Sequence, residues 1–277
     1  MPDWSRWLMP WRRRAPTIPA VRLHGVLGSV GLAGRGLTLA GIERALDGAF
    51  AHRRAPAVAL LINSPGGSPV QSAQIAGRIR ALAEEKGKPV LAFVEDVAAS
   101  GGYWLACAAD EIFADPASIV GSIGVISAGF GFEAAIARLG VERRVHATGA
   151  RKDMLDPFRP ERPADVELLR EIHAGILAEF VRYVRDRRGA RLGAEDAELF
   201  DGRVWTGKAA LPLGLIDGLG EARAVVRARF GPEARLVLAN PRRGLLQRLR
   251  GRAEAAHSVE ELFAAVEARA HWRRFGL

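Results

Sequence analysis

The sequence is poor in several features that would direct it to a particular class of protein. Its 277 residues include one cysteine, Cys107, few aromatic side chains and no run of about 20 apolar residues. A single cysteine forms neither an intramolecular disulfide nor a tetrathiolate metal site, so nothing in the sequence demands an oxidising compartment. We also expect no bound metal and no cofactor. Hydrophobic residues make up 49% and charged residues 26% of the chain, which is typical of a folded domain without membrane-spanning helices.

Lysine is also scarce: four lysines leave 36 arginines among the 40 basic residues, and the formal net charge is +9. The excess lies in a Trp- and Arg-rich segment, 1–18, and in a basic amphipathic tail, 241–277. Trp4, Trp7 and Trp11 would share one helix face, and Trp beside Arg suits lipid headgroups. We therefore expect these tails to contact anionic membrane or another subunit. No nucleic-acid-binding motif accompanies the charge, so nucleic acid is not an expected partner.

The middle of the chain, 19–240, is expected to form one domain in which strands and helices alternate. Helix 69–86 is the clearest, with Ser68 as its N-cap, Pro69 in its first position and Gly87 as its stop. The alternation predicts an α/β fold with a largely parallel sheet. The predicted strands are 21–27, 57–62, 90–94, 111–114, 141–147 and 235–238, and the other predicted helices are 42–50, 101–109, 132–139, 163–188, 206–213 and 221–230.

Two predicted turns from a strand into a helix have the composition of a catalytic site. In the first, 63–67 (Asn-Ser-Pro-Gly-Gly), Gly66 and Gly67 can present bare N–H groups to an oxyanion. The second, 98–104 (Ala-Ala-Ser-Gly-Gly-Tyr-Trp), places Ser100 at a helix start with the Gly101 N–H beside it. Because parallel strands end at the same edge of a sheet, the two turns are expected to face one crevice. Each alone also fits a structural role, as a helix N-cap or a Pro-Gly turn.

A serine nucleophile needs a base, and the sequence offers few candidates. The six histidines are scattered, and none follows strand 111–114 closely. Lys152 lies in loop 148–162, and a lysine that loses its hydration can accept a proton, whereas arginine cannot. Taken alone, Lys152 also fits an ordinary exposed loop lysine. Ala98 occupies the first glycine position of the Gly-x-Ser-x-Gly elbow, which argues against an α/β-hydrolase.

Five motifs, at 63–67, 98–104, 110–116, 121–126 and 149–153, resemble in order and spacing the signal peptide peptidase A family, serine peptidase family S49. The resemblance covers roughly residues 19–225 and implies a ClpP/crotonase-like spiral α/β fold. The site residues that it implies are Ser100 as nucleophile, Lys152 as base, Ser122 as a supporting hydroxyl and Gly67 and Gly101 as oxyanion donors, with Val120, Ile123 and Val125 as walls of an apolar substrate pocket.

The same resemblance implies an ATP-independent serine endopeptidase that forms ring-like homo-oligomers, in which neighbouring subunits of some members complete the active site. Its substrates would be cleaved signal peptides and other small or unfolded membrane-derived chains. This sequence differs from anchored members by lacking a transmembrane helix, and it has one protease unit where other members have two. We therefore expect a cytoplasmic protein, peripheral on the cytoplasmic face of the membrane if its tails bind lipid.

Two other functions stay open at this stage. A crotonase-like acyl-CoA enzyme would use the oxyanion turn but would leave Ser100 and Lys152 without roles, because a fold does not fix a function. A catalytically silent scaffold would bind hydrophobic peptides at a membrane without cutting them. Covalent labelling of Ser100 and turnover of peptides distinguish both from a protease.

Overall fold

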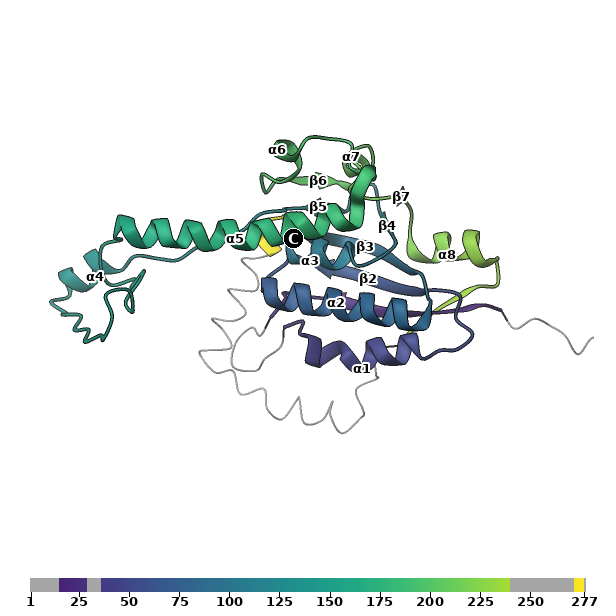
Figure 1. Cartoon of the computed structure of the whole chain (residues 1–277), viewed down its shortest axis with the longest axis horizontal. Coiled ribbons are helices and arrows are strands. Elements are labelled where there is room, and N and C mark those ends of the chain that lie inside the picture. The colour runs from purple at the N-terminus through teal and green to yellow at the C-terminus, as the bar shows by residue number, and fades with distance from the viewer. Residues whose placement is uncertain (1–14, 29–35, 240–271, 277) are drawn as a thin grey trace, which may run out of the picture.

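A twisted sheet of eight strands forms the core of the computed structural model, which describes residues 15–28, 36–239 and 272–276 (Figure 1). The strand order is β6-β5-β3-β2-β1-β8, with β4 pairing with β3 and β7. All pairs are parallel except β5 with β6, so the predicted α/β fold with a largely parallel sheet is confirmed. The strands are β1 (Thr17–His24), β2 (Val58–Ser64), β3 (Val90–Ala99), β4 (Glu111–Ala114), β5 (Ile119–Gly121), β6 (Val204–Thr206), β7 (Gly218–Leu219) and β8 (Arg235–Leu238).

The central strand β3 changes its neighbour partway along one edge. Its first half pairs with β4 and its second half with β5, while its other edge pairs with β2. The register with β2 shifts near Asn63, whose side chain fills the irregularity: its amide donates to Asp96 (2.6 Å), and its carbonyl accepts the Val97 N–H (3.3 Å). The bulge therefore keeps its backbone groups bonded where the strand changes neighbours.

Helices cover both faces of the sheet, and β2 is buried along its whole length, as expected for a central parallel strand. α2 has its predicted bounds: Ser68 Oγ accepts the Gln71 N–H, and Gly87 ends the helix at φ 59°. The helices are α1 (Leu39–Phe50), α2 (Pro69–Lys86), α3 (Gly101–Ala106), α4 (Glu133–Arg138), α5 (Pro163–Arg188), α6 (Asp196–Leu199), α7 (Gly207–Ala210) and α8 (Ala222–Phe230), with a 3₁₀ turn at Gly189–Arg191.

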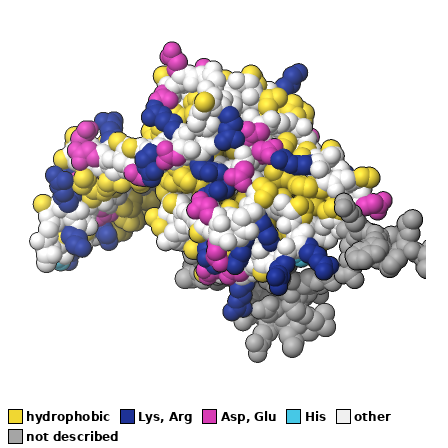
Figure 2. Space-filling view, turned by 45° about the vertical axis from the view of Figure 1, so that its right-hand side comes forward, with side chains coloured by type: hydrophobic (Ala, Val, Ile, Leu, Met, Phe, Trp, Pro, Cys, Tyr) yellow, Lys and Arg dark blue, Asp and Glu magenta, His cyan; other side chains and the backbone are white. Residues whose placement is uncertain are grey.

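A long projection, residues 127–175, extends from the body, and we call it the arm (Figure 1). It holds α4, the loop after it and the N-terminal half of α5. Only the C-terminal half of α5 packs on the core, where Phe180 and Val184 are buried, whereas α4 buries no residue. The predicted strand 141–147 is wrong, because the arm offers it no strand to pair with, and Val141 is 54% exposed. Hydrophobic side chains lie along the face of the arm that turns toward the body (Figure 2).

The C-terminal half of α5 is fixed by stacked rings and by the buried Arg188. Trp104 of α3 stacks on Phe180 with centroids 4.6 Å apart, and it also stacks on Tyr183 at 5.6 Å. The Arg188 side chain is 1% exposed and donates to the Asp217 carboxylate (2.7 Å) and the Gly214 carbonyl (2.6 Å). Both hydrogen-bonding partners are needed, because an uncompensated guanidinium in this position would be costly.

Several boundaries differ from the sequence-based expectation. β3 continues to Ala99, α3 ends at Ala106, and the short β5 was not predicted. Most of the two predicted tails, 1–14 and 240–271, lies outside the described residues, while β1 already begins at Thr17. Among the described helices, none combines the length and the apolar character needed to cross a lipid bilayer.

The Arg188–Asp217 pair gives a stability prediction. Burial raises the pKa of Asp217, but hydrogen bonds from Arg188 and from the Ile112 N–H outweigh it and leave the pKa below its usual value. Asp217→Asn leaves Arg188 buried without its counter-charge, so urea unfolding should show a loss of about 3 kcal/mol. The loss should be present above the unfolded-state pKa of about 3.9 and should fade as the pH drops through the lower folded-state pKa.

The control is Asp186→Asn, which removes an exposed partner of Arg182 on the same helix and should change stability by less than about 0.5 kcal/mol. Equal losses in the two variants would show that burial of the Arg188 pair does not matter.

Candidate active site

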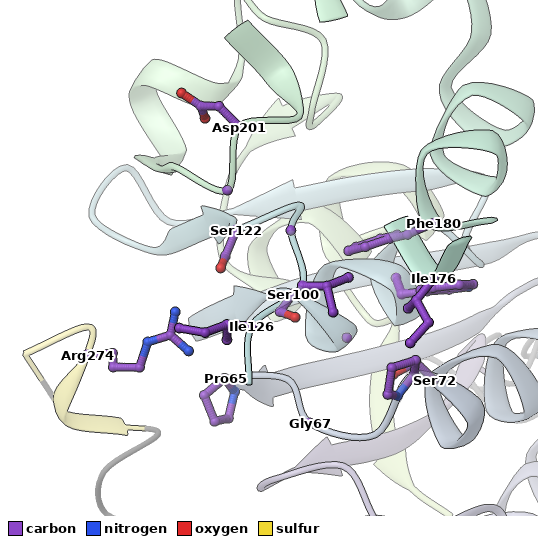
Figure 3. A pocket seen from close by; sticks show the side chains of 16 residues that line it. Pro65, Gly67, Ser72, Ser100, Ser122, Ile126, Ile176, Phe180, Asp201 and Arg274 are labelled. Atoms are coloured by element: carbon purple, nitrogen blue, oxygen red, sulfur yellow. The ribbon is translucent and has the colours of Figure 1, made fainter. Parts of the chain in front are cut away.

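A pocket of about 380 Å³ lies beyond the carboxyl ends of β2 and β3 (Figure 3). The turn after β2, the start of α3, the strand end after β5 and the middle of α5 surround it, and segment 272–276 closes one side. This is the edge at which parallel α/β sheets bind ligands. The pocket is lined by Pro65, Gly67, Pro69, Ser72, Ser100, Gly101, Trp104, Ser122, Gly124, Val125, Ile126, Ile176, Phe180, Asp201, Gly202 and Arg274.

Ser100 has an unusual backbone and an unbonded hydroxyl. Its φ of 53° and ψ of −123° are strained for a residue other than glycine. The conformation is held because the Ser100 N–H donates to the Gly121 carbonyl (2.7 Å) and the Ser100 carbonyl accepts the Tyr103 N–H (2.9 Å). Its hydroxyl does not cap α3 and makes no hydrogen bond within the described chain. Ser100 therefore occupies the N-cap position of α3 without capping the helix through its side chain, and the hydroxyl is available for chemistry.

The 63–67 turn approaches Ser100 very closely. A Cβ on Gly66 would lie 2.7 Å from Ser100 Cβ and 3.0 Å from the Gly101 nitrogen, so no side chain fits there. The Gly66 N–H already donates to Ser64 Oγ (3.3 Å), so Gly66 contributes close approach rather than a free donor. The N–H groups of Gly67 and Gly101 have no acceptor among the described residues. Two free donors thus belong to the turns that meet at Ser100, as an oxyanion hole requires.

Ser122 and one of the three predicted wall residues line the pocket, whereas the other two wall residues lie in the core. Ser122 lines the pocket and has φ 52°, fixed by its N–H bond to the Arg203 carbonyl (2.7 Å). Figure 3 shows its hydroxyl turned toward the space above Ser100. Of the predicted wall residues, Val125 lines the pocket, whereas Val120 and Ile123 are fully buried in the core beneath it.

Lys152 lies away from this pocket in its own chain. It is exposed in the arm, and its neighbour Asp153 is bonded to Arg162 (2.9 Å), the residue just before α5. Ile176, which lines the pocket, is about 20 Å farther along α5 from Pro163, at 1.5 Å per residue. A single chain therefore presents Ser100, the two N–H donors and Ser122 together, without Lys152.

Some lining residues were not predicted from sequence. Ile176 and Phe180 belong to the apolar stripe of α5, which the pattern assigns to a core, and Trp104 is stacked on Phe180. His173, one turn before Ile176, has its Nε2 2.7 Å from Ser127 Oγ and ties α5 to the pocket wall. Within the described ranges, no group of three His, Cys, Asp or Glu side chains is arranged to hold a metal ion.

The tight contact at Gly66 can be tested by substitution. Gly66→Ala should displace Ser100 or destabilise the fold by about 1 to 3 kcal/mol, because a backbone clash with positive φ cannot relax easily. Gly77→Ala is the matched control: it lies in α2 with nothing within 4 Å of the new Cβ and should stabilise by about 0.5 to 1 kcal/mol. Thermal unfolding of the two variants measures this, and similar behaviour would contradict the close approach.

Comparison with known proteins shows to which family the chain belongs. The chain is 48% identical over 291 residues to a Brucella abortus protein named Na(+)/H(+) antiporter NhaA, covering 100% of this chain and 39% of that protein. It is 35% identical to "Serine protease SPPA, chloroplastic" of Arabidopsis thaliana (62% and 25% covered) and 35% identical to "Protease 4" of Haemophilus influenzae (67% and 30%). The chain thus spans less than half of each of these relatives. Peptidase family S49 matches residues 82–230, more than half of the chain, and the protein therefore belongs to that family.

Proposed function

We propose that this protein is a serine endopeptidase in which Ser100 is the nucleophile and Lys152 of a neighbouring copy is the base. The observation that carries the proposal is the strained, unbonded Ser100 in a pocket shared with the free N–H groups of Gly67 and Gly101. An acyl-CoA hydratase would need the two N–H donors but would leave the unbonded Ser100 hydroxyl without a role.

The chemistry follows acyl transfer. The Ser100 oxygen attacks the peptide carbonyl while its proton passes to the Lys152 amine, and the carbonyl oxygen becomes an oxyanion held by the Gly67 and Gly101 N–H groups. Collapse breaks the C–N bond, with the proton going from the lysine to the leaving amine. Water then attacks the acyl-enzyme while Lys152 takes its proton, and collapse breaks the ester bond to Ser100. The lysine returns the proton to the Ser100 oxygen, which releases the acid and restores both residues. Ser122 orients the amine.

The structure of the arm favours a base that another copy of the chain supplies. Its exposed apolar side chains include Phe130 at 81%, Leu139 at 76% and Val141 at 54%, a face that a lone chain leaves to solvent. The loop that carries Lys152 is held in shape, because Asp153 accepts hydrogen bonds from Arg159 and Arg162. The hydrogen bond from Arg162 lowers the pKa of Asp153, so this anchor stays charged. Copies arranged in a ring would bury the arm and bring each Lys152 to the next pocket.

The proposed substrates are signal peptides and other small or unfolded membrane-derived chains. Trp104, Ile176 and Phe180 give the pocket an apolar wall suited to an apolar side chain beside the cut. An unfolded chain reaches such a recessed serine more easily than a folded domain does. Nothing in the proposed cycle consumes ATP. Peripheral contact with anionic membrane on the cytoplasmic side rests on the basic tails, most of which lie outside the described residues.

Substitution of the two residues tests the chemistry. Ser100→Ala should lower peptide turnover by at least about 10³-fold and abolish labelling by a fluorophosphonate, because the acyl-enzyme can no longer form. Lys152→Arg should be nearly as inactive as Lys152→Ala, since the charge stays but arginine does not accept the proton. Lys208→Arg, at the start of α7, is the matched control and should keep normal turnover. A Lys152→Arg enzyme with near-normal turnover would remove Lys152 as base.

Mixing the two inactive variants tests where the base comes from. Purified Ser100→Ala and Lys152→Ala chains, dissociated and reassembled together in equal amounts, should recover about a quarter of wild-type turnover if each site joins two copies. In that mixture one site in four pairs an intact serine with an intact lysine. Mixed assemblies of confirmed composition that stay inactive would place both residues of a working site in the same chain.

A further inference from the structure

Segment 272–276 brings the side chain of Arg274 to the pocket, although it follows the rest of the described chain by more than thirty residues. Trp272 anchors the segment by packing against His24, with the ring centroids 5.7 Å apart and the rings tilted by 32°. His24 ends β1 and is paired in register with Asn63, the first residue of the oxyanion turn. Two backbone bonds, Phe275 N–H to the Trp272 carbonyl (3.0 Å) and Gly276 N–H to the Arg273 carbonyl (3.1 Å), shape the segment.

Among the residues that line the pocket, Arg274 carries the charge that has no ion pair within the described part of the chain. The other charged one, Asp201, accepts hydrogen bonds from the backbone and side chain of Arg203 (2.9 and 2.7 Å), and Figure 3 shows it pointing away from the cavity. Arg274 has no ion pair among the described residues, and its guanidinium lies over the Phe275 ring, 5.9 Å from the centroid. A guanidinium offers five N–H donors in a plane that matches a carboxylate.

The charge and the apolar wall lie on opposite sides of Ser100. In Figure 3 the Arg274 side chain extends toward Ile126 and Pro65 on one side of the serine, while Ile176 and Phe180 stand on the other. A peptide whose scissile carbonyl sits at Ser100 therefore meets an apolar surface on one side of the cut and a cation on the other. Bound substrate would also cover the exposed guanidinium and reduce its hydration, which strengthens its pairing with an anion.

We propose that Arg274 is a specificity-determining residue that selects peptides carrying a carboxylate on the side of the scissile bond opposite the apolar pocket wall. This deepens the proposed peptidase function and rests on it. The carboxylate belongs either to an acidic side chain or to the free end of a short peptide, and both present the same chemistry to the guanidinium.

The test uses the full-length chain and two matched pairs of fluorogenic peptides. Both pairs keep one apolar residue beside the cut; one pair differs by Glu against Gln, and the other by a free carboxyl end against an amide. Wild-type protein should favour the carboxylate member of at least one pair by about tenfold in kcat/KM, and the responding pair identifies the source. The preference should shrink as salt is raised.

The variants assign that preference to one side chain. In Arg274→Gln the ratio between paired peptides should fall to about one, and in Arg274→Glu it should fall further and favour the neutral member, because the cation has become an anion. Arg273→Gln removes the neighbouring charge that does not line the pocket and should keep the wild-type ratio. Equal kcat/KM for both members of each pair in wild type, or an unchanged ratio in Arg274→Gln, would overturn the proposal while leaving the peptidase intact.

Binding separates this inference from the proposed function. Fluorescence anisotropy with the Ser100→Ala chain measures the same labelled peptides without turnover. If wild type cleaves no peptide, the peptidase proposal fails, and the inference is then decided by binding alone. Tighter binding of a carboxylate peptide that is lost in Ser100→Ala/Arg274→Gln supports carboxylate recognition, and equal binding of paired peptides overturns it.

Discussion

The positions of α5, of the apolar pocket wall and of the arm all depend on the buried guanidinium of Arg188. It sits at the end of α5, and its hydrogen-bond partners in the described chain are Asp217 and the Gly214 carbonyl, both in the segment that leads into β7. Arg187 adds bonds to the Cys107 and Ala109 carbonyls at the end of α3 (2.9 Å each). These contacts fix where α5 lies and, through it, both the apolar wall of the pocket and the direction of the arm. Because the charges are desolvated, losing one partner is far costlier than losing an exposed ion pair.

The pocket itself depends on two backbone turns that meet. Parallel pairing of β2 with β3 brings both turns to one edge, and the missing side chain of Gly66 lets them approach until Ser100 is in contact. The pairing of the Ser100 N–H with Gly121 then holds a conformation that serine would not adopt by itself. The strain is thus compensated by the surrounding sheet, which is why a small substitution at Gly66 should have a larger effect than one at Gly77.

The sequence was most informative where structure is decided locally. Ser68, Pro69 and Gly87 predict the ends of α2 because capping and positive φ are properties of neighbouring residues. The approach of the 63–67 turn to Ser100 was also predictable, since strand–helix alternation implies parallel strands. The arm was not, because the apolar stripe of α5 looks the same whether a core or solvent faces it. Nor was Arg274, whose position depends on Trp272 meeting His24, a contact between distant parts of the chain that no local pattern records.

Because α5 is continuous from the core to the far end of the arm, a change of its direction at one end displaces the other end. Its C-terminal half is held by the stack of Trp104, Phe180 and Tyr183, and its N-terminus follows the loop of Lys152. Over about 20 Å of helix, a tilt of about 5° at this stack moves the far end by nearly 2 Å, a shift comparable to those that impair proton transfer and alignment in active sites. Loss of the packing between these rings would therefore displace the loop of Lys152, while the fold and Ser100 stayed in place.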